Sequence, residues 1–268
     1  MPIRQLLKGV TLVTPVQKTL RRIERSPLGF RALNSLSGLR RVYPSFDQAW
    51  SAAQRHRSKS HDDQGLIKGN LDLSLKTRPS DYPVLYWLNQ IPQGGLTVFD
   101  FGGGAGQLFY HYSKYLRQGQ LREWIVMDLP EVIATGIEVA RQRGAQGLRF
   151  SASLSDCRGC DVFLAAGAFH YWEGTLRDLA EQTGGLPDHF IINRSPCCEK
   201  GDAFVSIQHG ESWAAPFLAR TPAGIEREFR ELGYELVDSW RVLEKTFNIP
   251  LLPGRKAPYM GFYFRRSS

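Results

Sequence analysis

The 268-residue sequence is poor in cysteine and contains no long hydrophobic run. Four cysteines are too few to form a disulfide framework, and we recognise no secretory signal, so we expect reduced thiols in a cytoplasmic protein. No apolar segment approaches the roughly 20 residues that a membrane-spanning helix needs. An apolar content of 42% still supports a packed core, which predicts one α/β domain of ordinary size with an extension.

Acidic residues are scarce in the N-terminal arm, residues 1–41, which carries the whole net charge of +8. Nine basic residues lie there beside one acid, Glu24, and the remaining chain is neutral. Apolar residues recur in the arm with helical spacing, which predicts a basic amphipathic stretch. Such a stretch can contact an anionic membrane surface or an acidic substrate, or it can pack on its own domain with solvated charges.

The rest of the chain is organised around a glycine-rich segment that follows a short apolar run. The run ends at Asp100, and glycines follow at every second position, Gly102, Gly104 and Gly106. Residues before the segment resemble a buried parallel strand and residues after it resemble a helix. Glycine permits both a sharp turn and the approach of a ligand to bare backbone. The segment therefore predicts the floor of a nucleotide-type cofactor site.

The segment lacks the third glycine of a dinucleotide-binding fingerprint, because Gln107 occupies that place. Its pattern, Asp-x-Gly-x-Gly-x-Gly, is similar to the first motif of class I methyltransferases, which use S-adenosylmethionine. This cofactor has no pyrophosphate but carries an ammonium group. An acid at the strand end, Asp100, then has a natural cationic partner, directly or through water.

A second acid, Asp128, ends the next predicted strand, where a carboxylate can accept hydrogen bonds from both ribose hydroxyls. The neighbouring Leu129 is a further candidate for cofactor contact. Ser153 and Leu154 follow the third predicted strand, at the place where an adenine ring would lie. Ala166 follows the fourth predicted strand, at the edge that faces the transferable methyl group.

These landmarks predict a Rossmann-like class I methyltransferase fold, a three-layer sandwich with a seven-stranded, mostly parallel sheet and a helical N-terminal cap. The last two strands are expected to form an antiparallel hairpin. We divide the chain into a basic arm (1–44), a helical cap over the carboxyl edge of the sheet (45–94) and a cofactor-binding domain (95–268).

From about Tyr43 onward the chain resembles a family of methyltransferases often encoded among polysaccharide-biosynthesis genes. Six segments carry the resemblance: Tyr82-Pro83-Val84-Leu85, Phe99-Asp100-Phe101-Gly102-Gly103-Gly104, Val126-Met127-Asp128-Leu129-Pro130, Ile191-Ile192-Asn193-Arg194-Ser195-Pro196, Phe204-Val205-Ser206-Ile207-Gln208 and Gly233-Tyr234-Glu235-Leu236. The resemblance implies S-adenosylmethionine as cofactor and a saccharide or glycan intermediate as acceptor. It does not extend to the first 40 residues.

Methyl transfer to a hydroxyl needs alignment of the nucleophile and a base to take its proton, and histidine is the usual base. Two histidines are candidates. His170 follows the fourth predicted strand at the methyl-facing edge, and His209 precedes Glu211, a carboxylate that can orient it. A lone histidine is more often structural, which is our interpretation of His111 and His189.

Arg194, at the end of the fifth predicted strand, binds an acidic sugar or phosphate in one interpretation and forms a surface salt bridge in the other. Tyr171 and Trp172 can wall the sulfonium by cation–π contact, with core packing as the alternative for Trp172. Gln208 and Tyr82, which lie in two of the segments that carry the resemblance, complete the candidate acceptor contacts.

Cysteine spacing does not favour a metal site. Cys157 and Cys160 form one spaced pair, but Cys197 and Cys198 are adjacent and aim poorly at one ion, so we predict no zinc. The segment after the fourth strand is Ala-Ala-Gly-Ala, without the Pro-Pro-aromatic clamp for a flipped base. Nucleic acid is therefore not the expected partner.

The sequence predicts an S-adenosylmethionine-dependent methyltransferase that O-methylates a sugar hydroxyl of a glycan precursor or a related small molecule. Two alternatives stay open. One is an RNA methyltransferase that uses the basic arm, and the other is a non-catalytic interaction protein with the cofactor fold.

Overall fold

The computed structural model describes residues 42–54, 77–92, 94–209, 214–245 and 257–267, together with Thr19, Ile23, Leu28 and Gly29. The amphipathic helix expected in the N-terminal arm lies outside these residues apart from the four isolated positions. The chain divides into two compact units. The first contains Met1–His61, Pro196–Pro222 and Thr246–Pro258, and the second contains Asp62–Ser195, Ala223–Lys245 and Tyr259–Ser268.

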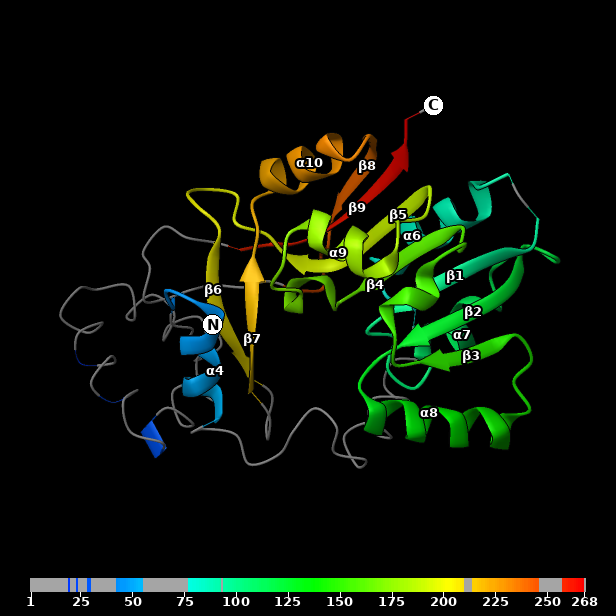
Figure 1. The fold of residues 1–268 in the computed structure, drawn as a ribbon, viewed down its shortest axis with the longest axis horizontal. Helices are drawn as coiled ribbons and strands as arrows, with labels where there is room; N and C mark the ends of the chain where they lie inside the picture. Colours follow the sequence, from blue (N-terminus) through cyan, green and yellow to red (C-terminus); the bar gives the residue numbers. More distant parts are fainter. Residues whose placement is uncertain are drawn as a thin grey trace, which may run out of the picture. The chain divides into compact units, whose positions relative to one another are not determined.

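The second unit is built on a seven-stranded sheet in the order β3-β2-β1-β4-β5-β9-β8 (Figure 1). The strands are β1 (Leu96–Phe101), β2 (Leu121–Met127), β3 (Leu148–Ser151), β4 (Val162–Ala166), β5 (His189–Pro196), β8 (Tyr234–Arg241) and β9 (Tyr259–Arg266). The first five strands are parallel, and β8 and β9 form an antiparallel hairpin. The predicted sheet and its terminal hairpin are therefore confirmed.

Parallel pairing gathers the carboxyl ends of the central strands at one edge of the sheet. Asp100 of β1 pairs with Val126 of β2, and Ala166 of β4 pairs with Asn193 of β5. Ligands of open α/β sheets bind outside this edge. The register thus places the predicted site residues that end or follow β1, β2, β4 and β5 at the same edge of the sheet.

Helices α6 (Asp81–Gln90) and α7 (Gln107–Tyr112) cover one face of the sheet, and α8 (Pro130–Arg143) packs beside α7. The core of this face comprises Val84, Leu85, Leu88, Val98, Leu108, Phe109, Tyr112, Trp124, Val126, Leu164 and Ile191. Every second side chain of a strand points to this face. Full burial of one such apolar side chain contributes about 1.5–3 kcal/mol to the stability of the fold. Helix α7 follows the glycine-rich segment as predicted, and it ends at Tyr112, where turns begin.

Aromatic rings form the core of the opposite face. The rings of Phe163 and Phe190 stack with centroids 4.3 Å apart, and Phe229 of α10 (Pro222–Glu231) meets Phe190 edge-on at 4.8 Å. Helix α9 (Leu176–Thr183) begins with a capping box and lies beside α10, since the Leu176 N–H donates to Glu228. Two 3₁₀ turns, η1 (Leu154–Cys157) and η2 (Phe169–Tyr171), complete the described elements of this unit.

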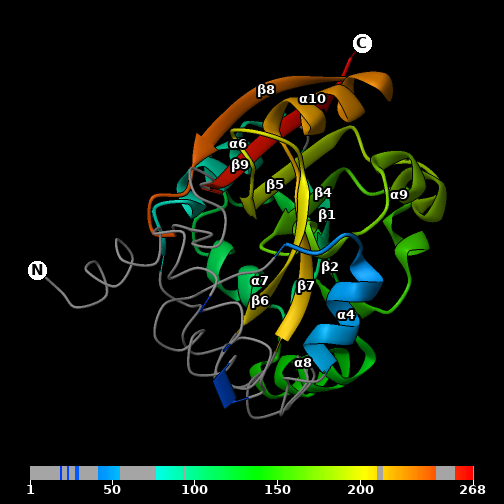
Figure 2. The same ribbon diagram turned by 90° about the vertical axis from the view of Figure 1, so that its left-hand side faces the viewer.

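The first unit pairs a helix with a small antiparallel sheet. Helix α4 (Phe46–Gln54) packs on strands β6 (Phe204–His209) and β7 (Ala214–Ala219) (Figure 2). Three buried alanines of α4 form its core with two residues of the sheet: Ala49, Ala52, Ala53, Ile207 and Ala214. The alternating segment Phe204–Gln208 predicts a strand or extended loop, in agreement with β6, whereas no sequence pattern predicts β7.

The predicted helical cap, residues 45–94, contains two described helices, which fall in different units. Helix α4 belongs to the first and α6 to the second. The predicted boundaries at residues 44 and 94 stay predictions. No helix in the described part of the chain is both long and apolar enough to cross a bilayer.

Candidate functional site

The glycine turn between β1 and α7 leaves its backbone bare. All three glycines of the predicted motif adopt positive φ: Gly102, Gly104 and Gly106. A Cβ at Gly102 would overlap Ala168, in the loop that follows β4, and one at Gly103 would overlap the carboxylate of Asp100. Left-handed backbone and close neighbours on both sides therefore require glycine here.

Asp100 lies beneath this turn and is only 1% exposed. Its Oδ2 accepts a hydrogen bond of 2.9 Å from the Trp124 indole N–H, while its Oδ1 is buried without a hydrogen-bond partner among the described residues. Burial raises the pKa of Asp100 to about 7, against the opposing effect of the Trp124 hydrogen bond. A buried carboxylate oxygen without a partner is costly unless a ligand satisfies it.

Asp128 connects the tip of β2 to the glycine turn. Its Oδ2 accepts the Gly104 N–H and its Oδ1 accepts the Leu129 N–H, both at 2.8 Å. Burial raises the pKa of Asp128, and the two backbone hydrogen bonds act in the opposite direction. Each carboxylate oxygen still has a second lone pair with which to accept a hydroxyl.

The two acids fit the cofactor predicted from the sequence. The buried Oδ1 of Asp100 calls for a cation or a water bound to one, and the remaining lone pairs of Asp128 suit neighbouring hydroxyls. An adenosyl sulfonium with its ammonium and ribose carries both groups. The glycines between the acids carry no side chains that would block backbone contact with such a ligand.

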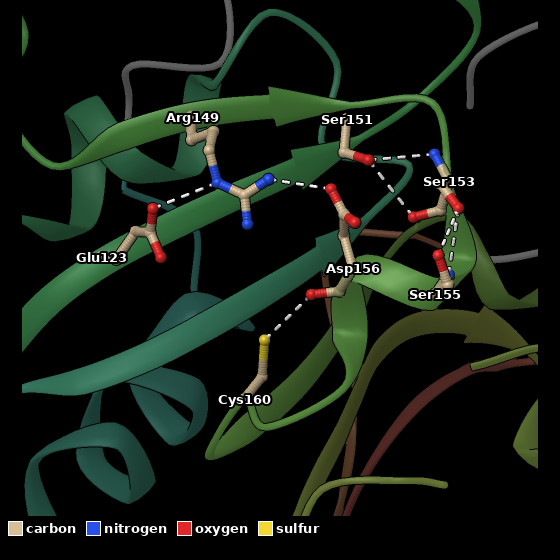
Figure 3. A network of polar contacts seen from close by, with 7 residues as sticks. All are labelled: Glu123, Arg149, Ser151, Ser153, Ser155, Asp156 and Cys160. Atoms are coloured by element: carbon tan, nitrogen blue, oxygen red, sulfur yellow. Dashed lines mark hydrogen bonds and ion pairs between the residues drawn. The ribbon is translucent and has the colours of Figure 1, made fainter. Parts of the chain in front are cut away.

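A serine network holds the loop after β3, where the adenine ring was predicted to lie (Figure 3). Ser151 Oγ accepts the Ser153 N–H at 2.9 Å, and Ser153 Oγ accepts the Ser155 N–H at 3.3 Å. Arg149 fixes the flanks by pairing with Glu123 and with Asp156. Ser153 is exposed and Leu154 half-buried. Their contact with adenine stays a prediction.

His170 lies in η2, just past the carboxyl end of β4, and is 2% exposed. Its ring centroid is 4.2 Å from that of Tyr171 and 6.4 Å from that of Tyr259. Trp172 is half-buried and meets Phe101 edge-on at 6.5 Å, so its contact with the sulfonium and its packing in the core both stay predictions. The structure thus places His170 and Tyr171 at the predicted edge of the sheet.

Arg194 forms a buried ion pair and not the surface salt bridge considered from the sequence. Its Nη1 lies 2.6 Å from Asp81 Oδ1, and both side chains are under 10% exposed. Nη2 donates to the carbonyl oxygen of Ala166 at 3.3 Å. The sequence missed the pairing because its partner lies 113 positions away, at the start of α6.

Further hydrogen bonds to Asp81 hold this ion pair in place. Tyr112 Oη donates to Asp81 Oδ1 at 2.8 Å, and the Arg78 N–H donates to Asp81 Oδ2 at the same distance. Arg194 itself has φ of 55°, a strained conformation for a residue other than glycine, and its N–H donates to Asn193 Oδ1. Strained backbone conformations of this kind cluster at functional sites in proteins.

Four other predicted residues lie on the surface of α6, in the first unit or outside the described residues. Tyr82 is on α6 with its side chain 61% exposed. Gln208 and His209 belong to β6 of the first unit, opposite Ala215 and Ala214, and Glu211 lies outside the described residues. The predicted contacts of Tyr82 and Gln208 with the acceptor, and the catalytic role of His209, stay predictions.

Sequence reasoning overlooked Trp124, Gly103 and Asp81. The first could have been found, because parallel strands β1 and β2 place Trp124 opposite Val98, one alternation below Asp100 on the same face. Gly103 belongs to the quoted motif but was not assigned a role. Nothing in the local sequence around Asp81 points to Arg194.

Metal binding has no support in the described residues, which contain no group of three or more His, Cys, Asp or Glu side chains able to hold an ion. The four cysteines are buried and none is in a disulfide. The Cys157 and Cys160 pair lies around η1 and precedes β4.

No protein-family model and no curated protein sequence matches the chain. Among solved structures, an S-adenosylmethionine-dependent methyltransferase from Clostridium acetobutylicum ATCC 824 aligns with a TM-score of 0.50 at 12% identity, covering 78% of this chain and 99% of its own. The Burkholderia thailandensis 1,6-didemethyltoxoflavin-N1-methyltransferase, solved with S-adenosylhomocysteine, has a TM-score of 0.49 at 19% identity and covers 77% and 88%. The Synechocystis PCC 6803 magnesium protoporphyrin IX methyltransferase has a TM-score of 0.47 at 14% identity and covers 90% and 97%.

The sheet order and the likeness to the Clostridium structure establish the fold. The second unit has the Rossmann-like class I methyltransferase fold, so the predicted fold class is confirmed. The association with polysaccharide biosynthesis stays a prediction.

Proposed function

We propose that this protein is an S-adenosylmethionine-dependent methyltransferase that O-methylates a sugar hydroxyl of a glycan precursor or a related small molecule. The observation that carries the proposal is the pair of acids at adjacent strand tips, joined by the glycine turn. Asp100 presents a buried oxygen for a cation and Asp128 presents lone pairs for hydroxyls. The fold places both beside the edge where ligands of such sheets bind.

In this proposal the chain's residues bind and orient the cofactor from three sides. Asp128 accepts hydrogen bonds from the ribose, Asp100 balances the ammonium charge, and the loop of Ser153 and Leu154 borders the adenine. Leu129 and Ala166 add contacts at the tips of β2 and β4. The cofactor, when bound, supplies an electrophilic methyl carbon and leaves as a neutral sulfide.

The chain must also align the acceptor and receive its proton. We assign the base to His170, because it follows β4 at the carboxyl edge of the sheet that carries both acids. Its imidazole takes the hydroxyl proton as the oxygen attacks the methyl carbon in line. Tyr171, whose ring lies against that of His170, borders the same place. His209 remains the alternative base.

The acceptor assignment comes from the sequence resemblance and is tested by product identification. The full chain is incubated with labelled S-adenosylmethionine and host glycan extracts, and the labelled product is identified. We expect a methyl ether on a sugar hydroxyl. Label in RNA would instead support the basic-arm alternative, and binding of the cofactor without turnover on any acceptor would support the non-catalytic one.

The base assignment is tested with His170→Asn. We expect kcat to fall by about 10²–10⁴-fold while the Kd for S-adenosylhomocysteine stays unchanged, since the imidazole is assigned to the acceptor proton. His111→Asn changes a buried histidine of α7 and serves as the matched control. Unchanged kcat in His170→Asn would contradict the assignment.

A further inference from the structure

Two cations beside the buried Arg194–Asp81 pair form no ion pair with any carboxylate among the described residues. Arg78 precedes α6 and Lys245 follows β8, and both side chains are half-buried. Long cationic side chains usually reach water or a carboxylate, so partial burial without an ion pair calls for an explanation.

The three cations of this region, Arg78, Arg194 and Lys245, lie close enough to act on one another; we call them the cationic cluster. Burial, followed by the charges of Arg194 and Arg78, lowers the pKa of Lys245 to about 8. Burial and Arg194 likewise lower the pKa of Arg78. Like charges held together in this way are destabilising unless an anion joins them.

The carboxylates near the cluster are already engaged. Asp81 is paired with Arg194 and accepts hydrogen bonds from Tyr112 and from the backbone of Arg78. Glu244 accepts a hydrogen bond from Ser80 Oγ and raises the pKa of Lys245 only as the weakest of four influences. Among the described residues, neither Asp81 nor Glu244 forms an ion pair with Arg78 or Lys245.

The cluster adjoins the edge assigned to methyl transfer. Arg194 bonds to Ala166 at the end of β4, and Lys245 Nζ lies 4.9 Å from the centre of the Tyr259 ring. The same ring also lies near that of His170, with centroids 6.4 Å apart. The Tyr259 ring thus lies near both Lys245 and the proposed base.

We propose that Arg78 and Lys245 bind a carboxylate or phosphate group of the acceptor, so that the substrate of this enzyme is an anionic sugar. The inference rests on the proposed function and narrows its substrate class. The bound anion joins the two cations and holds the sugar so that its hydroxyl can reach His170. Arg194 is a positioning residue, because Asp81 and Ala166 occupy its Nη atoms.

The test compares sugars that differ in charge, using the full chain. Glucuronate, glucose 6-phosphate and neutral glucose are titrated by saturation-transfer NMR, with and without S-adenosylhomocysteine. We expect at least one anionic sugar to bind about tenfold more tightly than glucose. The carboxylate and phosphate arms show which anion fits.

Variants connect the preference to the two cations. The double variant Arg78→Gln with Lys245→Gln should bind anionic sugars no more tightly than glucose. Lys245→Arg keeps the charge, so it should retain the preference for the anionic sugar. The matched control, Arg177→Gln with Arg227→Gln, removes two exposed cations from α9 and α10 and should also retain it. Circular dichroism melting of each variant checks that it is folded.

Three outcomes overturn the proposal: equal affinity for charged and neutral sugars, no binding of any of the three, or a preference that survives the Arg78→Gln with Lys245→Gln change. Binding of S-adenosylhomocysteine is measured in the same samples. Its absence contradicts the proposed function, even where charge-dependent sugar binding shows that the anion site exists.

Discussion

The carboxyl edge of the sheet carries opposite charges at its two ends. Asp100 and Asp128 lie over β1 and β2, and burial raises the pKa of both acids. Arg78 and Lys245 lie beside β5 and β8, and burial lowers the pKa of both cations. In both regions, these charged groups form no ion pair within the part of the chain that the structure describes. The comparison indicates a cationic ligand group at the acids and an anionic ligand group at the cations.

The Arg194–Asp81 pair, which lies between the two regions, is balanced internally, and breaking it should have the largest effect. Asp81→Ala leaves a buried guanidinium without its carboxylate and removes the acceptor of Tyr112. We expect the free energy of unfolding, measured by urea denaturation, to fall by about 3–5 kcal/mol.

The control for this change is an exposed ion pair. Glu226→Ala removes the partner of Arg230 on the surface of α10, where both side chains are exposed, and should cost less than about 1 kcal/mol. If both variants lost the same free energy of unfolding, the buried Arg194–Asp81 pair would contribute no more to stability than an exposed ion pair.

The next largest effect concerns cofactor affinity. Asp128→Ala removes the proposed ribose partner and the acceptor of the Gly104 N–H. The Kd for S-adenosylhomocysteine, measured by calorimetry, should rise about 10- to 100-fold. Glu181→Ala removes an exposed acid of α9 and should leave the Kd unchanged. An unchanged Kd in Asp128→Ala would show that Asp128 does not bind the cofactor.

The pKa of Asp100 makes stability depend on pH. In the folded protein it is about 7, whereas an unfolded chain has a pKa near 3.9, so between these values the folded state binds more protons. The free energy of unfolding should therefore fall as pH rises from about 4 to 7, by at most about 1.4 kcal/mol for each pH unit from this group.

Asp100→Asn isolates this contribution, because the amide does not titrate. The difference in unfolding free energy between wild type and variant should change with pH between about 4 and 7 and level off above that range. A difference that is constant across the range would show that Asp100 has an ordinary pKa.

The smallest effect is expected in the loop after β3. Ser153→Ala removes the side chain that caps η1 by accepting the Ser155 N–H, which should cost about 0.5–1 kcal/mol of stability in urea denaturation. Ser155→Ala keeps this cap and loses only the hydroxyl contact, so it should cost less. The reverse order would contradict the capping role.

The sequence predicted the region of the acids far better than the region of the cations. The glycine turn, Asp100 and Asp128 lie in segments whose local pattern specifies a strand, a sharp turn and a helix. The cationic cluster instead joins residues from before α6, the end of β5 and the end of β8. No local pattern relates Arg78 to Lys245, and only the folded sheet brings them near Arg194.

The first unit was missed for a related reason. Strand β6 alternates well enough to be expected as a strand or loop, but β7, Ala-Ala-Pro-Phe-Leu-Ala, has no clear alternation of polar and apolar residues. Its pairing with β6 and the packing of α4 against both depend on contacts between distant segments.

The central claim is that the glycine turn and its two acids bind an adenosyl sulfonium. Isothermal titration of the full chain with S-adenosylhomocysteine, and in parallel with a nicotinamide dinucleotide, tests it most directly. The account predicts one site for S-adenosylhomocysteine that is weakened in Asp128→Ala, and no binding of the dinucleotide. Binding of the dinucleotide instead, or of neither ligand, would contradict it.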